Sequence, residues 1–384
     1  MCLAEEHYKK EIARLDNLKV FAERIGALKD SGRKAGIDAF LVVSDKNMRY
    51  LAGFSALAIE RFAGILVPVD AGNPVVIVPR LEESKARERS VFKDIKTYSD
   101  SENPATLIEK TVEELELKKA TFGVEGFLPF KFYRMLVGCS PDIETWDASA
   151  LFSELRIVKS EEELGTIEKA AEIVAEGIQS GIDSIKPGVS ELAISCQIER
   201  VIKERGGESI PFCIVLSGPN SALPHGETSN RKVERKDVVL MDVGALYNGY
   251  YGDLTRTVFV GEATQKERQI YQVVAEANRR AIETVRPGIK AEEIDATARN
   301  VIEKAGFGQY FTHRTGHGLG LEVHEEPYIC EGNKMPLQPG MVFTVEPGIY
   351  LSGKFGVRIE DNVAVSKTGV KILDHISKEL IVIH

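Results

Sequence analysis

Two aspartates interrupt a stretch of the sequence that otherwise has the composition of buried β-structure. The segment VVLMDVGALYNGYYGDLTRT, residues 238–257, contains Asp242 after four apolar residues and Asp253 eleven positions later. A single aspartate in a strand is usually exposed at an edge or hydrogen-bonded, so either residue alone predicts little. Together they raise the question of why a predicted core strand carries two carboxylates.

The turn between the two aspartates predicts their relative position. Asn248-Gly249 is the strongest short signal for a two-residue type I′ hairpin. Pairing about this turn places Gly244 opposite Asp253, so Asp242 and Asp253 lie on the same face as diagonal neighbours. Such neighbours have Cα atoms about 7–8 Å apart, close enough for two side chains to converge on one small object.

A second segment repeats this pattern near the C-terminus. VVLMDVGALY and VFTVEPGIY share an apolar run, an acid, one residue, a glycine, an apolar stretch and a tyrosine. A three-residue loop at 352–354 would place Glu346 opposite Glu360. The two segments predict a duplicated unit of helices and a hairpin that faces its twin.

Four carboxylates from two facing hairpins would meet in the interior. They cannot all stay charged there unless protons or cations neutralise them. Two divalent cations would bring four positive charges against four negative ones, which is the charge balance of a dinuclear hydrolytic site. The pattern therefore predicts a metal centre.

Four of the seven histidines fall between residues 225 and 324, namely His225, His313, His317 and His324. Glycines on both sides of His317 allow a close approach of the backbone and leave its imidazole uncrowded. An imidazole that joins carboxylates suits Mn²⁺, Co²⁺, Fe²⁺ or Zn²⁺ better than Mg²⁺ or Ca²⁺. His225 and His324 are better placed to orient a substrate or to move protons.

The elements that must position these residues suggest two domains in the 384-residue chain. Residues 1–154 alternate helical patterns with buried strands such as AFLVVS and NPVVIVP, which predicts a small α/β domain. A capping box at Ser160 and Glu163 then begins a long amphipathic helix, so the second domain is predicted to span 155–384. In it, helical stretches at 265–285 and 291–305 separate two strand-rich blocks.

Composition excludes several classes of partner. The chain is 43% hydrophobic and 28% charged, with a net charge of −9 and no polybasic tract, so neither nucleic acid nor an anionic membrane is expected as a partner. No apolar run approaches the roughly 20 residues that span a bilayer. The charged N-terminus lacks the pattern of a signal peptide, and the five scattered cysteines predict free thiols, so a cytoplasmic location is expected.

At these residues the chain resembles the pita-bread metallopeptidases, which include methionine aminopeptidase, Xaa-Pro aminopeptidase and Xaa-Pro dipeptidase (prolidase). The segments MDVGALYNGYYGDLTRT, HRTGHGLGLEVHEEP, LQPGMVFTVEPGIY and GVRIEDN match that family's signature blocks in order and spacing, and SALPHG and LRIVKSEEEL resemble its proline-specific branch. The resemblance covers the whole chain. It implies an α/β (α+β) protein, with a creatinase-like N-terminal domain before a pseudo-twofold pita-bread catalytic domain that has a curved antiparallel sheet.

The resemblance also implies roles for individual residues. Asp253 and Glu360 would bridge two metal ions, and the full ligand set would be Asp242, Asp253, His317, Glu346 and Glu360. Glu346 would in addition move the proton of the attacking water, and His225 and His324 would hold the scissile carbonyl and the developing oxyanion. Arg358 would order Glu360 or bind the substrate, and Phe212 would line a pocket for the proline ring.

The implied function is hydrolysis of the bond between an N-terminal residue and proline in a di- or oligopeptide. Xaa-Pro dipeptidase activity is favoured, with two Mn²⁺ or Co²⁺ ions (Zn²⁺ and Fe²⁺ are the alternatives) and a homodimeric assembly. Tyr328 stands where some close prolidases carry a basic residue, which leaves Xaa-Pro aminopeptidase activity as an alternative. A metal-free creatinase-type hydrolase and a binding module without activity are the remaining alternatives, and both predict lost ligands.

Overall fold

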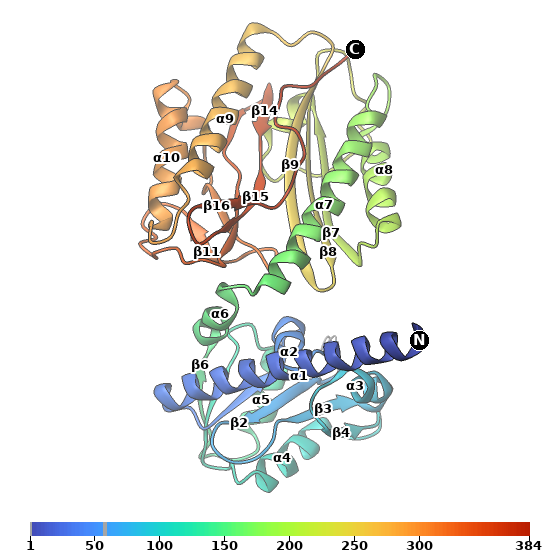
Figure 1. Cartoon of the computed structure of the whole chain (residues 1–384), viewed down its shortest axis with the longest axis vertical. Coiled ribbons are helices and arrows are strands. Elements are labelled where there is room, and N and C mark those ends of the chain that lie inside the picture. Colours follow the sequence, from blue (N-terminus) through green and yellow to red (C-terminus); the bar gives the residue numbers. More distant parts are fainter. Residues whose placement is uncertain (1, 57–59) are drawn as a thin grey trace. The chain divides into compact units, whose positions relative to one another are not determined.

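The computed structural model describes the backbone of residues 2–56 and 60–384 and the side chains of residues 18–56 and 60–384. The chain divides into two compact units, Met1–Leu155 and Arg156–His384 (Figure 1). Within the described ranges, no helix combines the length and apolar composition needed to cross a bilayer.

The N-terminal unit is a mixed sheet with helices, in agreement with the predicted α/β class. Its sheet has the order β4-β3-β2-β1-β5-β6, with β1 antiparallel to β2 and parallel to β5. The strands are β1 (Ala39–Val42), β2 (Gly64–Pro68), β3 (Val75–Pro79), β4 (Asp94–Tyr98), β5 (Thr121–Val124) and β6 (Glu144–Asp147). The helices are α1 (Cys2–Ala35), α2 (Asp45–Ala52), α3 (Glu83–Arg89), α4 (Pro104–Glu114), α5 (Phe130–Val137) and α6 (Ser149–Ile157), the last of which continues into the second unit.

The C-terminal unit contains two halves of similar construction. The first half has α7 (Glu161–Ser184), α8 (Glu191–Glu204), β7 (Ser209–Ser217), β8 (Val238–Tyr247) and β9 (Tyr250–Val260). The second has α9 (Gln265–Thr284), α10 (Ala291–Lys304), β10 (Gly316–Gly318), β11 (Glu325–Ile329), β12 (Val342–Val345), β13 (Gly348–Leu351), β14 (Phe355–Arg358), β15 (Asp361–Val365) and β16 (Val370–Ile372). The short strand β17 (Val382–Ile383) joins the edge of the first sheet beside β9.

Each half buries its strands against its own helix pair. One apolar cluster joins α7 and α8 to β7, β8 and β9, and another joins α9 and α10 to β12, β13, β14 and β15. Figure 1 shows the two helix pairs on opposite sides of the strands. This arrangement agrees with the predicted duplication, and it leaves the strands of both halves facing one another.

The register of both hairpins agrees with the sequence prediction. Asn248 and Gly249 have φ values of 46° and 83°, as a type I′ turn requires, and Gly244 pairs with Asp253. In the second hairpin Leu351 pairs with Phe355 across the loop at 352–354. The ladders of β13–β14 and β12–β15 keep one register, so Glu346 and Glu360 fall opposite each other at the interruption between them.

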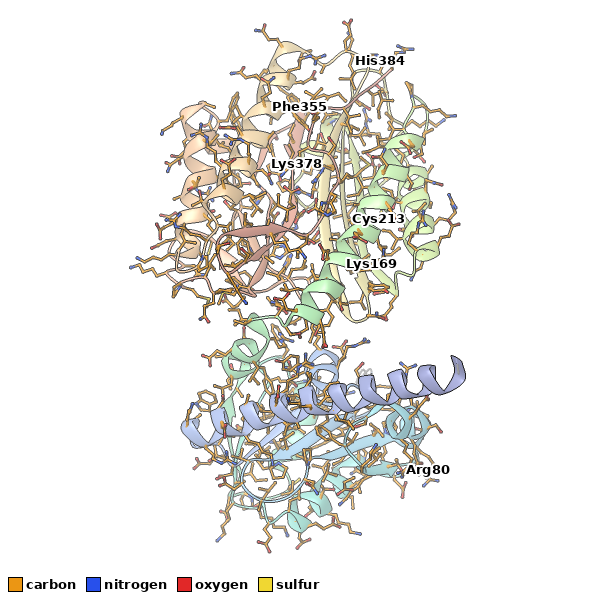
Figure 2. All side chains as sticks on the ribbon, viewed as in Figure 1. Arg80, Lys169, Cys213, Phe355, Lys378 and His384 are labelled. Carbon is orange, nitrogen blue, oxygen red and sulfur yellow. The ribbon has the colours of Figure 1, made fainter. Side chains whose placement is uncertain are left out.

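A buried ionic cluster holds the strand that follows Glu360. The Arg256 guanidinium lies 2.8 Å from Asp361 Oδ1 and 3.3 Å from Asp374 Oδ1. Lys378, which is labelled in Figure 2, extends this cluster, because its Nζ lies 2.9 Å from Asp361 Oδ2. Because removing one partner of a buried pair leaves an uncompensated charge, this cluster keeps β9 and β15 in a defined relation.

The predicted capping box is present at the start of α7, and the helix lies very close to β9. Ser160 Oγ accepts from the Glu163 N–H, and the Glu163 carboxylate accepts from the Ser160 N–H. A Cβ atom added at Gly252 would lie 2.6 Å from the carbonyl carbon of Ala170 and 2.6 Å from the nitrogen of Ala171. Glycine at position 252 therefore allows the helix to pack on the strand that carries Asp253.

We expect Gly252→Ala to lower the thermal stability of the protein, because the new methyl group meets helix backbone that cannot rotate away. Overpacking of this kind costs about 1–3 kcal/mol. Gly165→Ala, an exposed position of the same helix with open space around it, is the control, and it should be neutral or stabilising by up to about 1 kcal/mol. Melting temperatures of the two variants check this, and equal values would contradict the packing argument.

Candidate metal centre

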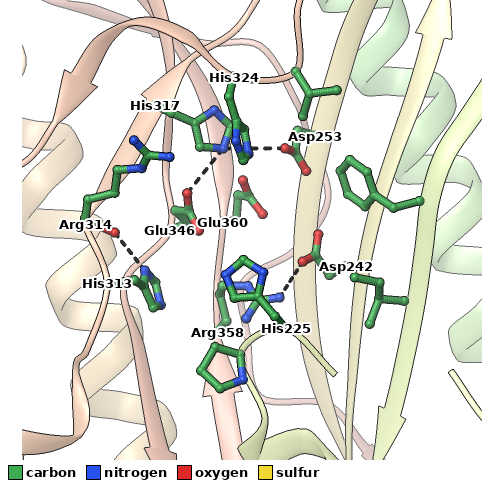
Figure 3. Close-up of a pocket in the computed structure, with 14 residues that line it drawn as sticks. His225, Asp242, Asp253, His313, Arg314, His317, His324, Glu346, Arg358 and Glu360 are labelled. Atoms are coloured by element: carbon green, nitrogen blue, oxygen red, sulfur yellow. Dashed lines mark hydrogen bonds and ion pairs between the residues drawn. The ribbon is translucent and has the colours of Figure 1, made fainter. Parts of the chain in front are cut away.

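The structure brings the five predicted metal ligands together from both halves of the C-terminal unit (Figure 3). Asp242 lies on β8, Asp253 on β9 and His317 on β10, and Glu346 and Glu360 lie in the breaks between β12 and β13 and between β14 and β15. Potential ligand atoms lie within 4.8 Å of one another in three overlapping groups: Asp242, Asp253 and Glu360; His317, Glu346 and Glu360; and Asp253, His317 and His324. Because Glu360 is common to the first two groups, the arrangement suits two neighbouring cations.

His317 presents one nitrogen to the carboxylates. Its Nδ1 lies 3.1 Å from the Gly318 carbonyl oxygen, so a proton on Nδ1 leaves the Nε2 lone pair free. Nε2 lies 3.4 Å from Glu346 Oε1 and 3.8 Å from Asp253 Oδ2. Burial lowers the pKa of His317 to about 3, which keeps the imidazole neutral, as a metal ligand must be.

The backbone around His317 requires glycine, as the sequence predicted. A Cβ atom at Gly316 would lie 1.8 Å from the Thr344 carbonyl oxygen on β12. The Thr344 hydroxyl in turn accepts from the His317 N–H at 3.1 Å. These contacts hold His317 against the strand that leads to Glu346.

The carboxylates carry more negative charge than the surrounding protein compensates. Burial raises the pKa of Asp253 and of Glu360 well above the ordinary range, and the neighbouring carboxylates raise both further. Burial also raises the pKa of Glu346 to about 7. Asp253 Oδ1 is buried without a hydrogen-bond partner. The site therefore offers an oxygen without a partner, several close carboxylates and one neutral imidazole. These are ligand atoms and negative charges that suit divalent cations.

Arg358 supports the centre through Asp242. Its guanidinium pairs with Asp242 Oδ2 through Nη2, donates to the Tyr350 hydroxyl at 2.7 Å through Nη1, and donates to Thr255 Oγ1 at 3.1 Å through Nε. The Thr255 hydroxyl donates to Glu360 Oε2 at 2.6 Å. The predicted link between Arg358 and Glu360 is therefore indirect, whereas the contact with Asp242 is direct.

Each half also forms hydrogen bonds to the backbone of a predicted ligand in the other half. The Asn362 side chain accepts from the Asp253 N–H at 3.1 Å and donates to the Asp253 carbonyl. In the opposite direction, Arg256 Nη1 donates to the Glu360 carbonyl. The relative position of Asp253 and Glu360 therefore depends on the packing of both halves.

A cavity of about 280 Å³ opens beside the carboxylates. Its lining includes the apolar side chains of Phe212, Ile214, Pro224 and Val323 together with His225, His313, His324 and Arg314. His225 and His324 are exposed to this cavity, and the ring of His324 lies 3.9 Å from that of His317, centroid to centroid. The cavity thus combines a small apolar wall with exposed imidazoles next to the carboxylates.

The segment that carries His225 is fixed at both ends by Glu191, a fully buried residue of α8. Glu191 Oε1 accepts from the Ser217 N–H at 2.7 Å and hydroxyl at 2.8 Å, and from Asn220 Nδ2 at 3.0 Å. Glu191 Oε2 accepts from the Ser229 N–H at 3.0 Å and hydroxyl at 2.6 Å. Nothing in the local sequence around Glu191 indicated this contact.

Three residues at this cavity had no predicted role. His313 and Arg314 lie in its wall, and Tyr350 lies behind it, with its hydroxyl 2.9 Å from His313 Nε2. The sequence offered two signals for these residues. Tyr350 belongs to the duplicated pattern, and His313 and Arg314 lie in the glycine-rich segment. Neither signal predicted the contact between Tyr350 and His313.

Comparison with known proteins agrees with this geometry. Residues 165–367 match the Metallopeptidase family M24, and residues 24–158 match the Creatinase/Prolidase N-terminal domain. The chain belongs to the M24 metallopeptidases, as the resemblance predicted.

Relatives within this family match over nearly the whole chain. A Xaa-Pro dipeptidase of Pyrococcus horikoshii is 37% identical over 95% of this chain and 100% of the relative. The crystal structure of a prolidase from Thermococcus sibiricus matches with a TM-score of 0.89 and 41% identity, over 94% of this chain and 99% of that one. An X-Pro aminopeptidase from Thermotoga maritima matches with a TM-score of 0.83 and 33% identity, over 92% and 100%.

We expect the melting temperature of the chelated protein to fall as the pH rises from about 5.5 to 8. The raised pKa of Glu346, about 7, means that the metal-free folded state holds a proton that the unfolded state has lost. This stabilisation is present at low pH and is lost as the pH passes 7. One pKa unit corresponds to about 1.4 kcal/mol, which shifts the melting temperature of such a domain by about 2–4 °C per kcal/mol.

With excess Mn²⁺ the same measurement should show no fall or a rise, because deprotonated ligands bind the cation more tightly. Glu346→Gln in chelator is the control, and its melting temperature should depend less on pH. An identical pH dependence with and without Mn²⁺ would argue against cation binding at these carboxylates.

Proposed function

We propose that this protein is a Xaa-Pro dipeptidase that uses two divalent metal ions at Asp242, Asp253, His317, Glu346 and Glu360. The observation that carries the proposal is the convergence of these five donors beside a small cavity with an apolar wall. The identity of 37% to the Xaa-Pro dipeptidase of Pyrococcus horikoshii over its full length supports the substrate class.

The residues at the cavity support a hydrolytic mechanism. Divalent cations at these donors would lower the pKa of a water molecule and polarise the scissile carbonyl. Glu346 accepts the proton of the attacking water and passes it to the leaving nitrogen of proline. Its side chain is 16% exposed, lies 3.4 Å from His317 Nε2 and lines the cavity, which suits this transfer.

His225 and His324 orient the substrate. Both are exposed to the cavity and can donate to the scissile carbonyl oxygen and to the oxyanion that develops from it. The segment of His225 is held by Glu191, so its imidazole is positioned before the substrate binds. Arg358 supports the candidate metal ligands and does not bind the substrate, because its donors already contact Asp242, Tyr350 and Thr255.

The apolar wall selects proline. Phe212 and Ile214 on β7 lie near Pro224 and Val323 around the cavity, and they can enclose a pyrrolidine ring. The imide nitrogen of an Xaa-Pro bond carries no hydrogen to donate, so shape rather than hydrogen bonding distinguishes this substrate. A cavity of about 280 Å³ lies at the small end of ligand pockets, which favours a short peptide.

We infer that Mn²⁺ or Co²⁺ serves as the metal, with Zn²⁺ and Fe²⁺ as alternatives, because one imidazole accompanies four carboxylates. We also infer a homodimer, on the family resemblance. A cytoplasmic location is our third inference, and the free thiols of Cys139, Cys196, Cys213 and Cys330 among the described residues support it.

Xaa-Pro aminopeptidase activity on longer peptides is the second candidate function. The similarity to the X-Pro aminopeptidase of Thermotoga maritima favours it. A creatinase-type reaction is less well supported, because all five metal positions hold residues that can bind a metal.

The function is tested by the hydrolysis of three substrates, each with Mn²⁺ and with Co²⁺. We expect turnover of Ala-Pro, weaker turnover of Ala-Pro-Gly and little turnover of Ala-Ala. A preference for Ala-Pro-Gly would favour the aminopeptidase alternative. The proposal fails if none of the three peptides is hydrolysed by the metal-loaded protein.

We expect Glu346→Gln to lower kcat for Ala-Pro by a factor of about 10² or more, because the amide cannot take up the proton. Far-UV circular dichroism should show an intact fold. Glu331→Gln, at an exposed position, is the control and should retain full activity. An active Glu346→Gln enzyme would overturn the role of Glu346.

A further inference from the structure

The two arginines that line the cavity differ in how their donors are used. The Arg358 guanidinium is buried and contacts Asp242, Tyr350 and Thr255. The side chain of Arg314 is only partly buried, and within the described part of the chain its guanidinium makes no hydrogen bond or ion pair. Arg314 therefore has the donors that a ligand can use.

An aromatic ring holds Arg314 in place. The guanidinium carbon lies 4.4 Å from the centroid of the Tyr328 ring, which is a cation–π contact. Tyr328 lies on β11, where its N–H donates to Glu326 Oε2 at 3.0 Å and its carbonyl accepts from Asn333 Nδ2 at 2.6 Å. Stacking uses one face of the guanidinium and leaves the N–H groups at its edge available.

Arg314 lies on the side of the cavity near Glu346 and His317, across from Asp242 (Figure 3). Two divalent cations would balance the four carboxylates of the metal centre, so these carboxylates would not need Arg314 as a counter-charge. A dipeptide substrate always carries one anionic group, its C-terminal carboxylate, whatever its first residue is. A guanidinium matches a carboxylate in shape and charge, since it can donate two parallel hydrogen bonds.

We propose that Arg314, positioned by Tyr328, binds the free C-terminal carboxylate of the dipeptide substrate. This inference rests on the proposed function and deepens it, because it names the group that distinguishes a dipeptide from a longer or capped peptide. It assigns to Arg314 the selection for peptide length, and to Tyr328 the role of a positioning residue.

The test compares two substrates and two proteins. Wild-type and Arg314→Gln proteins, both loaded with Mn²⁺, are assayed with Ala-Pro and with Ala-Pro amide, which differ only in the terminal charge. We expect wild-type to prefer Ala-Pro by about 10- to 100-fold in kcat/KM, mainly through KM, as a lost charge-assisted hydrogen bond predicts. Arg314→Gln should lose this preference, because its kcat/KM for Ala-Pro should fall while its kcat/KM for Ala-Pro amide stays unchanged.

The outcomes separate this inference from the proposed function. If wild-type hydrolyses neither substrate, the proposed function fails. If wild-type hydrolyses both substrates and Arg314→Gln lowers kcat/KM equally for both, the inference is overturned and the proposed function stands. The inference would also be overturned if Arg314→Gln lost activity only on peptides with an acidic first residue, such as Asp-Pro. Arg314 would then select the first side chain.

Further variants separate charge, geometry and stacking. Arg314→Lys keeps the charge without the paired donors, and we expect it to recover part of the preference for Ala-Pro. Tyr328→Phe keeps the ring and should retain a KM near that of wild-type. Tyr328→Leu should raise KM for Ala-Pro but not for Ala-Pro amide, and equal effects of the Phe and Leu variants would remove Tyr328 from the proposal.

Discussion

Repulsion among four crowded carboxylates, two of them buried and two half-buried, is the constraint on which the rest of the C-terminal unit depends. Asp242, Asp253, Glu346 and Glu360 gather where burial raises the pKa of Asp253, Glu346 and Glu360. The guanidinium of Arg358 forms an ion pair with one of these carboxylates, that of Asp242. One positive charge cannot compensate four carboxylates, so cation binding at this site would relieve their repulsion.

The duplicated construction explains how such an unfavourable cluster is held together. Each half buries its strands against its own helix pair, and this apolar burial holds the acids of the two hairpins in facing positions. The backbone of Asp253 is bound by Asn362, and that of Glu360 by Arg256. Metal affinity and the stability of the unit are therefore linked, because the same packing determines both.

The two arginines that line the cavity use their donors differently. Arg358 is buried and its donors are used within the protein, so it supports the carboxylates from behind. Arg314 stacks on Tyr328 and keeps its donors at the cavity. A guanidinium allows both arrangements because it has donors at its edge and a face that can stack.

The sequence by itself determined the registers of the hairpins and pointed to the candidate metal ligands. The type I′ turn at Asn248-Gly249 and the three-residue loop at 352–354 set the registers, since a hairpin's pairing follows from its turn and from residues close in sequence. The family resemblance supplied His317 as the candidate imidazole ligand. Helix starts such as Ser160 could also be predicted, because capping involves residues three positions apart.

Only the tertiary structure decided which side chains contact the candidate metal ligands and which line the cavity. The partner of Arg358 is Asp242, 116 positions away, and the contacts of Glu191 with Ser229 and of Tyr350 with His313 also join separate segments. Such contacts depend on how helices and strands from both halves pack, and no local pattern encodes that packing. The stacking of Arg314 on Tyr328 likewise appears only when β11 is folded beside the segment that precedes β10.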